Sequence, residues 1–387
     1  MRILHTSDWH LGRNFHGVDL LQAQVSTLEA LVDVCRAEAV DVVVVAGDIY
    51  DRAIPAADAV SALDHVLSEI RATGAVIVGI SGNHDSAVRV GFAERVLTNA
   101  GVTIRGDIAT AGSPVLVPET SGSHAVAFYP IPYLDLEPAR VALDAPEARS
   151  HDRLLQVALD RARHDLAART NVRSVAIVHA FVTGGETSDS ELALAVGGSA
   201  EVALKNLSGF DYAALGHLHA RQSFGKGTAR YSGSPLPYSF SERNHVKGMW
   251  LIDLAIDGNM QCRPVELPVF RPLQQLRGEL SDLLQNTEFA HAEQHFVQAI
   301  LTDATLPMGA MEKLRRRFPH AVALEHQPPV REGDGTSYVD RVKGRTDLEL
   351  SLDFLEHVTG VEPTEAQRDE LAGVIDAGTT PGEHQAA

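Results

Sequence analysis

The chain has 387 residues, of which 44% are hydrophobic and 22% charged, and its formal net charge is -18. The length exceeds that of one typical domain, and the composition excludes a fibrous or largely disordered protein. The acidic balance argues against a free-standing DNA-binding protein, because such affinity comes from Lys and Arg at phosphates. If the substrate is a nucleic acid, metal ions or a partner must supply positive charge.

Two further features restrict the compartment and the kind of metal site. No run approaches the roughly 20 apolar residues that a membrane span requires, and the N-terminus has no signal-peptide pattern. We therefore expect a cytoplasmic protein with no membrane contact. The only cysteines are Cys35 and Cys262, each within an apolar pattern. A disulfide framework or a thiolate site is not expected, so any metal must use nitrogen and oxygen ligands.

In the first two thirds of the chain, apolar strand patterns alternate with helix patterns. Continuous β-branched runs such as 40–46 suit strands that are buried on both faces. The alternation predicts a largely parallel sheet with helices packed on its faces. In chain order we predict a strand at 2–6, a helix at 19–38, a strand at 40–46, a helix at 56–73, a strand at 75–80, short strands within 114–130, a helix at 151–170, and strands at 174–178 and 211–215.

A change of composition around 264–272, where three prolines occur, predicts a domain boundary. Beyond it, the patterns predict a small strand–helix–strand module and then two short helices between 347 and 375. We expect four parts, which are a main domain at 1–265, a small α+β module at 270–340, a helical segment at 345–376 and a disordered polar tail at 377–387.

Side chains that bind metals or transfer protons follow the ends of the predicted strands. In open α/β sheets, ligands bind outside the carboxyl ends of the strands, so we expect these side chains to converge. Asp8 and His10 are two residues apart, and in an extended chain such positions face the same side. A lone His is usually structural, as we interpret His5, His65 and His124, but repeated placement behind strands favours one shared site. The ordered series is Asp8-x-His10, Gly47-Asp48, Gly82-Asn83-His84, His179 and Gly216-His217-x-His219.

This series resembles the calcineurin-like metallophosphoesterase superfamily, whose pattern is D-x-H, G-D, G-N-H-[DE], H and G-H-x-H in that order. Within it, the chain is similar to bacterial nuclease subunits that act with an SbcC-type ATPase in DNA recombination and repair. The closer similarity rests on "HTSDWHLGRNF", "AGDIYDRAIP", "ISGNHDS", "ALGHLH" and "YSGSPLPYSFSE". It implies an α/β sandwich of two β-sheets flanked by helices, with a small α+β capping domain and a helical C-terminal segment.

The resemblance also implies a site for two divalent metal ions. It assigns Asp8, His10, Asp48 and His219 to one ion, and Asp48, Asn83, His179 and His217 to the other. Asp48 would bridge the ions, since a carboxylate has two oxygens and can span ions about 3.5–4 Å apart. A mixed nitrogen and oxygen set without thiolate favours manganese over a closed structural zinc site.

Two more residues are candidates for catalysis. His84 directly follows Asn83, and in the superfamily this His protonates the leaving oxygen or stabilises the charged transition state. General acid catalysis of this kind typically contributes about 10²–10⁴-fold. Asp51 resembles the carboxylate that holds this His by a hydrogen bond, and we hypothesise an Asp51–His84 pair. Asp85 is interpreted either as a turn former or as a residue behind the site.

The remaining patterns concern partners. An apolar stripe on the predicted helix near 350 either packs within the chain or docks in a partner's groove. The resemblance implies that 345–376 binds the SbcC-type ATPase and that the cap shapes the DNA path. It also implies a homodimer within a heterotetramer. The stripe consists of Leu348, Leu352, Leu355 and Val358. We interpret the basic run Lys313, Arg315, Arg316 and Arg317 as a solvated helix face. Near the N-terminus, Arg13, Asn14 and His16 either contact a DNA backbone or form a solvated loop.

We therefore expect a DNA double-strand exonuclease and single-strand or hairpin endonuclease, whose duplex activity depends on ATP hydrolysis by the partner. One alternative is a protein or small-molecule phosphoesterase of the same superfamily. Ser81 stands where such phosphatases usually carry Arg, and the long tail has no place in a compact phosphatase. The other alternative is a non-catalytic DNA-end scaffold, which the intact His84 argues against.

Overall fold

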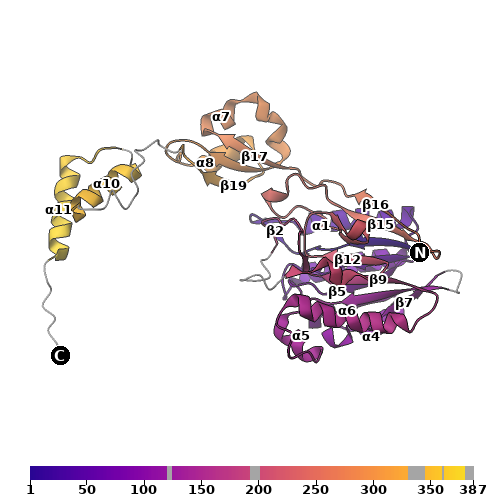
Figure 1. Cartoon of the computed structure of the whole chain (residues 1–387). Coiled ribbons are helices and arrows are strands. Elements are labelled where there is room, and N and C mark those ends of the chain that lie inside the picture. Colours follow the sequence, from indigo (N-terminus) through magenta and orange to yellow (C-terminus); the bar gives the residue numbers. More distant parts are fainter. Residues whose placement is uncertain (120–123, 192–200, 330–344, 360, 380–387) are drawn as a thin grey trace. The chain divides into compact units, whose positions relative to one another are not determined.

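The computed structural model describes residues 1–119, 124–191, 201–329, 345–359 and 361–379. The chain divides into two compact units, Met1–Pro328 and Pro329–Ala387. The first unit contains two six-stranded sheets, a three-stranded sheet and the helices that cover them (Figure 1). Among the described helices, none is long and apolar enough to cross a membrane.

The first six-stranded sheet has the strand order β16-β15-β1-β4-β5-β6. Its four strands from β1 to β6 are parallel, whereas β15 runs antiparallel to both β1 and β16. The bounds are β1 (Arg2–Thr6), β4 (Val42–Val45), β5 (Val76–Ile80), β6 (Val102–Arg105), β15 (Gly248–Leu254) and β16 (Met260–Glu266), and helices α1 (Leu21–Ala37) and α2 (Ala57–Ala72) cover one face.

The second six-stranded sheet has the order β13-β14-β12-β9-β8-β7. Its central strands β14, β12, β9 and β8 are parallel. The bounds are β7 (Val115–Pro118), β8 (Ala125–Ile131), β9 (Val172–His179), β12 (Tyr212–Gly216), β13 (Gln222–Phe224) and β14 (Ala229–Tyr231), and helices α5 (Leu136–Ala142) and α6 (His151–Ala167) pack on the outer face.

The core consists of three apolar layers, because each sheet is buried on both faces. In β4, Val42 and Val44 face the other sheet, while Val43 and Val45 face the helices α1 and α2. Full burial of a valine side chain is worth roughly 1.5–3 kcal/mol, so an uninterrupted β-branched run is stable only in such a position. The predicted sandwich of two sheets flanked by helices is confirmed.

A three-stranded parallel sheet forms a separate small module with its own apolar core. The sequence predicted its second and third strands and the helix between them. It missed the first strand, because "LQQLRG" has too few apolar residues for a clear pattern. The module also contacts the sandwich, where the rings of Phe15 and Phe296 lie 5.3 Å apart. The bounds are β17 (Leu273–Gly278), α7 (Leu280–Gln285), β18 (Phe296–Leu301), α8 (Ala310–Arg317) and β19 (Ala321–His326).

The basic run on α8 is bonded within this module. Arg315 donates to the carbonyl of Ala321 at 3.0 Å, and Arg317 donates to the carbonyl of Leu283 at 2.9 Å. These guanidinium groups therefore support the fold of the module rather than forming only a solvated face.

The second unit contains the two predicted helices, α10 (Asp347–Thr359) and α11 (Glu365–Thr379). In the predicted apolar stripe, Leu352 is buried whereas Val358 is 64% exposed, so the stripe is only partly covered within the chain. Helix α11 reaches Thr379 and includes the start of the segment expected to be disordered. The rest of that tail lies outside the described residues.

Gly216 provides a test of the close packing at the end of β12. A Cβ atom there would lie 1.9 Å from the Ala46 carbonyl oxygen. Overpacking of a buried position typically costs about 1–3 kcal/mol, so we expect Gly216→Ala to lower the free energy of unfolding by at least this amount in urea titrations. Gly278→Ala is the matched control, because its nearest atom would be 3.4 Å away. Equal losses in the two variants would contradict the steric explanation.

Candidate metal centre

The site lies at the carboxyl ends of parallel strands from both six-stranded sheets. The predicted ligands follow β1, β4 and β5 of the first sheet and β12 of the second, and His179 is the last residue of β9. Because the two sheets are stacked, the ends of these strands meet, and His10 and His219 become neighbours although they are 209 residues apart in the chain. The convergence that the sequence predicted is present.

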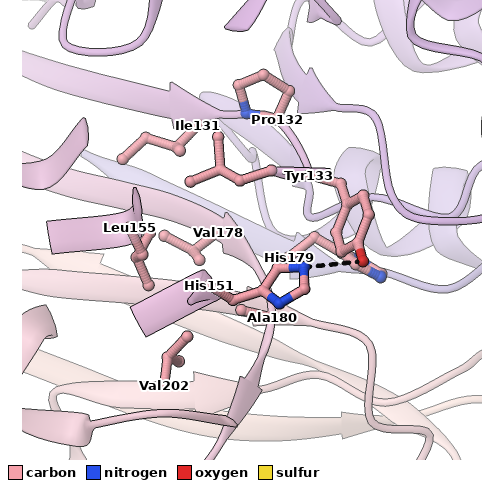
Figure 2. A pocket seen from close by; sticks show the side chains of 10 residues that line it. Ile131, Pro132, Tyr133, His151, Leu155, Val178, His179, Ala180 and Val202 are labelled. Carbon is pink, nitrogen blue, oxygen red and sulfur yellow. Dashed lines mark hydrogen bonds between the residues drawn. The ribbon is translucent and has the colours of Figure 1, made fainter. Parts of the chain in front are cut away.

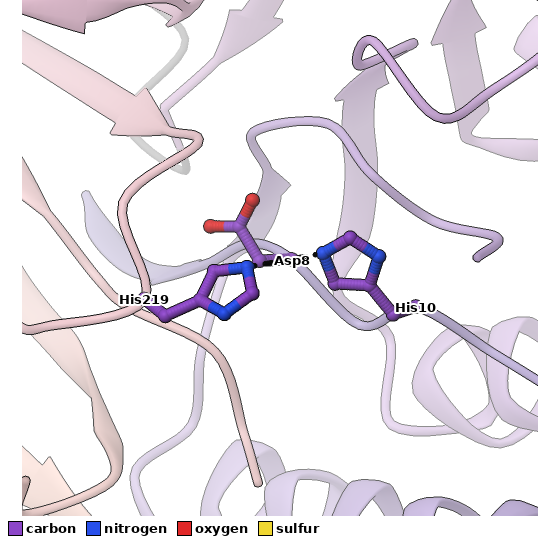
Figure 3. A group of neighbouring side chains, drawn as sticks. All are labelled: Asp8, His10 and His219. Atoms are coloured by element: carbon purple, nitrogen blue, oxygen red, sulfur yellow. Dashed lines mark hydrogen bonds between the residues drawn. The ribbon is translucent and has the colours of Figure 1, made fainter. Parts of the chain in front are cut away.

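One group of side chains combines the first residues of the predicted ligand series, Asp8 and His10, with its last residue, His219. Atoms of Asp8, His10 and His219 that could bind a metal all lie within 4.8 Å of one another, and the three residues are buried. The Nε2 atoms of His10 and His219 are 3.2 Å apart. Figure 3 shows these imidazoles facing each other beside the Asp8 carboxylate.

A second group centres on Asp48. Its Oδ2 atom lies 3.5 Å from both His10 Nε2 and His179 Nε2. The Nε2 atom of His179 also lies 2.8 Å from Asn83 Oδ1, and the ring of His217 lies beside that of His179 with centroids 5.4 Å apart. Asp48 therefore stands between His10 of the first group and His179 of the second.

The backbone at these residues is not extended, which corrects one step of the sequence prediction. Asp8, His10 and Asp48 have φ values of 54°, 46° and 50°, and His217 has a φ of 111°. The first strand ends at Thr6, so left-handed turns rather than strand alternation aim Asp8 and His10 at one point. Such backbone is costly for residues other than glycine, although Asp and His adopt it more often than most, and it persists where the surroundings hold it.

Backbone hydrogen bonds hold these turns in place. The N–H of Asp8 donates to the Gly47 carbonyl at 3.0 Å, and the N–H of His10 donates to the Asp48 carbonyl at 2.9 Å. A Cβ on Gly82 would lie 2.1 Å from Asp48 Oδ1, so only glycine permits this approach. The loops after β1 and β4 are therefore joined by hydrogen bonds, and the loop after β5 packs closely against the loop after β4.

Burial controls the protonation of the site. It raises the pKa of Asp8 well above its usual value, with the nearby Asp48 charge as a second cause, and raises the pKa of Asp48 to about 6. Burial also lowers the pKa of His10 well below its usual value and that of His179 to about 4. At neutral pH the imidazoles of His10 and His179 are therefore uncharged, with lone pairs available for a cation.

The donor set fits metal ions. The cluster contains the buried carboxylates of Asp8 and Asp48, and the ring nitrogens of His10 and His219 face each other. These groups offer negative charge and lone pairs, and none of the grouped side chains is a Lys or Arg that could neutralise them. Nitrogen and oxygen donors together suit a divalent transition metal. The clusters around Asp8 and Asp48 and the family resemblance together indicate a site for two metal ions.

His84 lies beside the cluster, but its partner differs from the expected one. Its Nδ1 bonds the backbone carbonyl oxygen of Asp51 at 2.8 Å, and its backbone N–H donates to Asp48 Oδ1 at 2.9 Å. The prediction placed this hydrogen bond on the Asp51 carboxylate, whereas the structure has it on the Asp51 backbone carbonyl. The carboxylate instead lies 3.5 Å from Arg13 Nη1 and 3.7 Å from His10 Nδ1. His84 also belongs to a compact group with His10 and Asp48.

Asp85 supports the site from behind. Its carboxylate accepts from the backbone N–H groups of Gly82, Ile49 and Tyr50 at 2.9–3.0 Å. These bonds join the loop after β5 to the loop after β4. Of the two interpretations that the sequence allowed, the structure favours the residue behind the site.

The sequence missed a set of residues around His219. Ser190 Oγ lies 2.6 Å from His219 Nδ1, and Glu191 accepts from the backbone N–H of His219 at 2.8 Å. Glu242 and Lys247 form a buried ion pair behind them. Glu242 ends the quoted segment "YSGSPLPYSFSE", but no spacing rule connects it to a histidine 23 residues earlier.

A cleft of about 550 Å³ opens beside the cluster, between the sandwich and the small module. Ser190 and Tyr238 line it and also contact His219, with the Tyr238 and His219 rings 5.6 Å apart. A cleft of this volume can hold a nucleotide-sized group. The other lining residues used below are Arg13 and Arg243 from the sandwich, and Gln275, Gln298 and Glu325 from the module.

A second pocket lies next to His179 and is too small for a substrate. Its volume is about 10 Å³, which leaves room for one water molecule. Figure 2 shows apolar side chains around it, together with the hydrogen bond between Tyr133 and His151, whose atoms are 3.3 Å apart.

Comparisons with known proteins agree with this geometry. Residues 1–221, which include all the predicted ligands, match the family described as calcineurin-like phosphoesterase. Residues 269–359 match the family described as type 5 capsule protein repressor C-terminal domain. The chain is also similar to the SbcD subunit of the nuclease SbcCD from Staphylococcus epidermidis, with 28% identity over 376 residues that cover 97% of this chain and 98% of the relative.

Two solved structures are also similar. One is the protein TT1561 of Thermus thermophilus, with 12% identity and a TM-score of 0.39, covering 68% of this chain and 98% of that one. The other is a dimetal phosphatase from Danio rerio, with 15% identity and a TM-score of 0.37, covering 69% of this chain and 98% of that one.

The raised carboxylate pKa values predict how metal binding depends on pH. Below pH 6 the Asp48 carboxyl carries a proton that an incoming ion must displace, and Asp8 adds a second such proton. The apparent affinity for Mn²⁺ should therefore fall by about tenfold per pH unit for each displaced proton as the pH drops below 6. Isothermal titration calorimetry between pH 5 and 8 measures this. An affinity that is the same at pH 5 and pH 7 would contradict the raised pKa values.

Proposed function

The chain belongs to the calcineurin-like phosphoesterase family, and from this premise we propose that it is a metal-dependent nuclease subunit. It would act as a double-strand exonuclease and a single-strand or hairpin endonuclease together with an SbcC-type ATPase. The observation that carries the proposal is the buried cluster around Asp48 beside an open cleft. The similarity over nearly the whole chain to a nuclease subunit supports the same assignment.

The metal centre is part of this proposal. We assign one divalent ion to Asp8, His10, Asp48 and His219, and the other to Asp48, Asn83, His179 and His217, with manganese as the favoured metal. When bound, such ions stabilise charge on the phosphoryl group and supply a nucleophile from water near neutral pH. The 3.5 Å distances from Asp48 to His10 and His179 support the bridging role of this carboxylate.

His84 is proposed as the general acid. Its Nδ1–H is held by the backbone carbonyl of Asp51, so Nε2 is the atom that can carry a proton to the leaving oxygen. The Asp51 carboxylate, which contacts Arg13 and His10, would assist by fixing these neighbours.

The cleft offers groups that suit a nucleic acid backbone. The Arg13 guanidinium lies over the Tyr238 ring at 5.0 Å and donates to the Ser190 carbonyl at 2.9 Å, which holds it at the cleft wall. Arg243 lines the same cleft. We propose that these cations contact phosphates next to the scissile bond, while the metal ions offset the acidic charge of the chain.

The remaining parts are assigned in the same way. We propose that 1–265 is the nuclease domain, that 270–340 is a cap that shapes the DNA path and that 345–376 binds the ATPase. The exposed Phe354 and Val358 on α10 support a partner-binding role for the last segment. A homodimer within a heterotetramer, and a location in the cytoplasm where DNA is repaired, complete the proposal.

Cleavage assays with DNA and with p-nitrophenyl phosphate distinguish this function from the alternatives. Hairpin DNA should be cut in the presence of Mn²⁺, duplex ends should require the ATPase and ATP, and p-nitrophenyl phosphate should be a poor substrate. Faster turnover of p-nitrophenyl phosphate, with intact hairpins, would indicate a small-molecule phosphoesterase. Binding of DNA ends without cleavage of either substrate would indicate a scaffold.

Removal of the His84 imidazole tests its assigned role. We expect His84→Gln to reduce hairpin cleavage by about 10²–10⁴-fold, because the proton donor to the leaving oxygen is lost. Elemental analysis should still find two metal ions per chain. His65→Gln is the matched control, since His65 is exposed on α2 and contacts only Glu29 among the hydrogen-bond partners described. Loss of a metal ion in His84→Gln would identify His84 as a ligand instead.

A further inference from the structure

A set of buried polar side chains surrounds the Nδ1 side of His219. This nitrogen lies 2.6 Å from Ser190 Oγ and 3.3 Å from Glu242 Oε1, whereas the opposite nitrogen, Nε2, faces His10. Ser190 also forms a hydrogen bond with Glu242. The side chains of His219 and Glu242 are 1% and 0% exposed, so water does not compete for these bonds.

The direction of these hydrogen bonds decides the tautomer of His219. A carboxylate only accepts, so the Ser190 hydroxyl donates its one hydrogen to Glu242 and accepts from His219. The ring hydrogen therefore sits on Nδ1, and Nε2 keeps a lone pair directed at the cluster. A hydrogen bond at the far nitrogen is the usual way in which a protein orients a metal-binding imidazole.

Lys247 balances the charge of Glu242. The two side chains form an ion pair that is almost fully buried. The other ammonium hydrogens are donated to the His219 carbonyl at 2.9 Å and to Ser234 Oγ at 2.8 Å. Burial disfavours the charged form of Glu242, but Lys247 and the contact with His219 together outweigh this and lower the pKa of the carboxyl below its usual value. Removal of either partner alone would leave an unpaired buried charge, so the two residues must be replaced together.

His219 is thus held at its side chain and its backbone by charged residues. Glu191 accepts from its N–H, Lys247 donates to its carbonyl, and Ser190 with Glu242 hold Nδ1. His10 differs, because within the part of the chain that the structure describes its Nδ1 is buried without a hydrogen-bond partner. His179 differs as well, because its Nδ1 bonds the backbone carbonyl of Ala46 at 2.9 Å. The relay through a side chain to a buried carboxylate therefore distinguishes His219 from these two histidines.

We propose that Glu242, acting through Ser190 and with Lys247 as its counter-ion, is a positioning residue that keeps His219 in the Nδ1–H tautomer for metal binding. The inference rests on the proposed metal centre. Glu242 contacts neither substrate nor metal, so its contribution is an increase in affinity for one of the two ions.

Ser190→Ala tests the relay while leaving the ion pair intact. In calorimetric titration of the metal-stripped full chain with Mn²⁺, we expect one of the two ions to bind about 10–100-fold more weakly. Ser174→Ala is the matched control, because its hydroxyl is also buried and also donates to a carboxylate, that of Asp211 at 3.0 Å, but it lies near the start of β9 and outside the relay. It should change neither affinity by more than about twofold. Wild-type affinity in Ser190→Ala would overturn the inference.

A double-mutant cycle shows whether the effect passes through His219. In a His219→Ala background, which itself should weaken one ion, Ser190→Ala should cause no further loss. An equal loss in both backgrounds would overturn the positioning role. Unchanged metal binding in His219→Ala alone would instead overturn the metal centre, and this inference with it.

Replacement of the ion pair gives a second measurement if Ser190→Ala does not fold. The double variant Glu242→Leu/Lys247→Met keeps the volume and removes both charges together, a change that proteins commonly tolerate. The Mn²⁺ affinity of this double variant should fall by the same factor as that of Ser190→Ala. Its melting temperature should stay close to that of the wild type. Wild-type Mn²⁺ affinity in this variant would also overturn the proposal.

Discussion

The burial of two carboxylates among uncharged imidazoles is the constraint on which the rest of the site depends. Asp8 and Asp48 are almost inaccessible to water, and their raised pKa values show that ionisation is costly there. A buried negative charge is stable only beside a cation or in a dense set of hydrogen bonds. His10 and His179 are poor sources of that cation, because burial lowers the pKa of both imidazoles, so the arrangement favours metal ions.

The sandwich provides the rigidity that such a cluster needs. The loops after the strands carry left-handed backbone at Asp8, His10 and Asp48, which an isolated peptide would rarely adopt. Packed β-branched strands below and backbone hydrogen bonds between the loops hold this conformation. Local strain is thereby offset by the core, and the ligand atoms remain at fixed positions.

The surroundings of the cluster supply two kinds of charged group. The cleft between the sandwich and the small module is lined by Arg13 and Arg243, together with the acidic Asp189 and Glu325. Glu242 and Lys247 are sealed from solvent behind His219. Ser190 connects the two regions, because it lines the cleft and also bonds both His219 and Glu242.

The sequence alone determined the family, the sandwich and the residues that gather at the site. Apolar runs report burial on both faces, and ligand types behind several strand ends are too ordered to arise by chance. The tertiary structure decided what depends on contacts between distant segments. The backbone oxygen rather than the carboxylate of Asp51 binds His84, and Glu242 reaches His219 from a loop of its own. Strand β17 could not be predicted from its sequence, because its residues are too polar to form an apolar strand pattern. The structure identifies it by its pairing with β18. Local patterns encode periodicity and residue type, whereas hydrogen-bond partners are fixed only when the chain has packed.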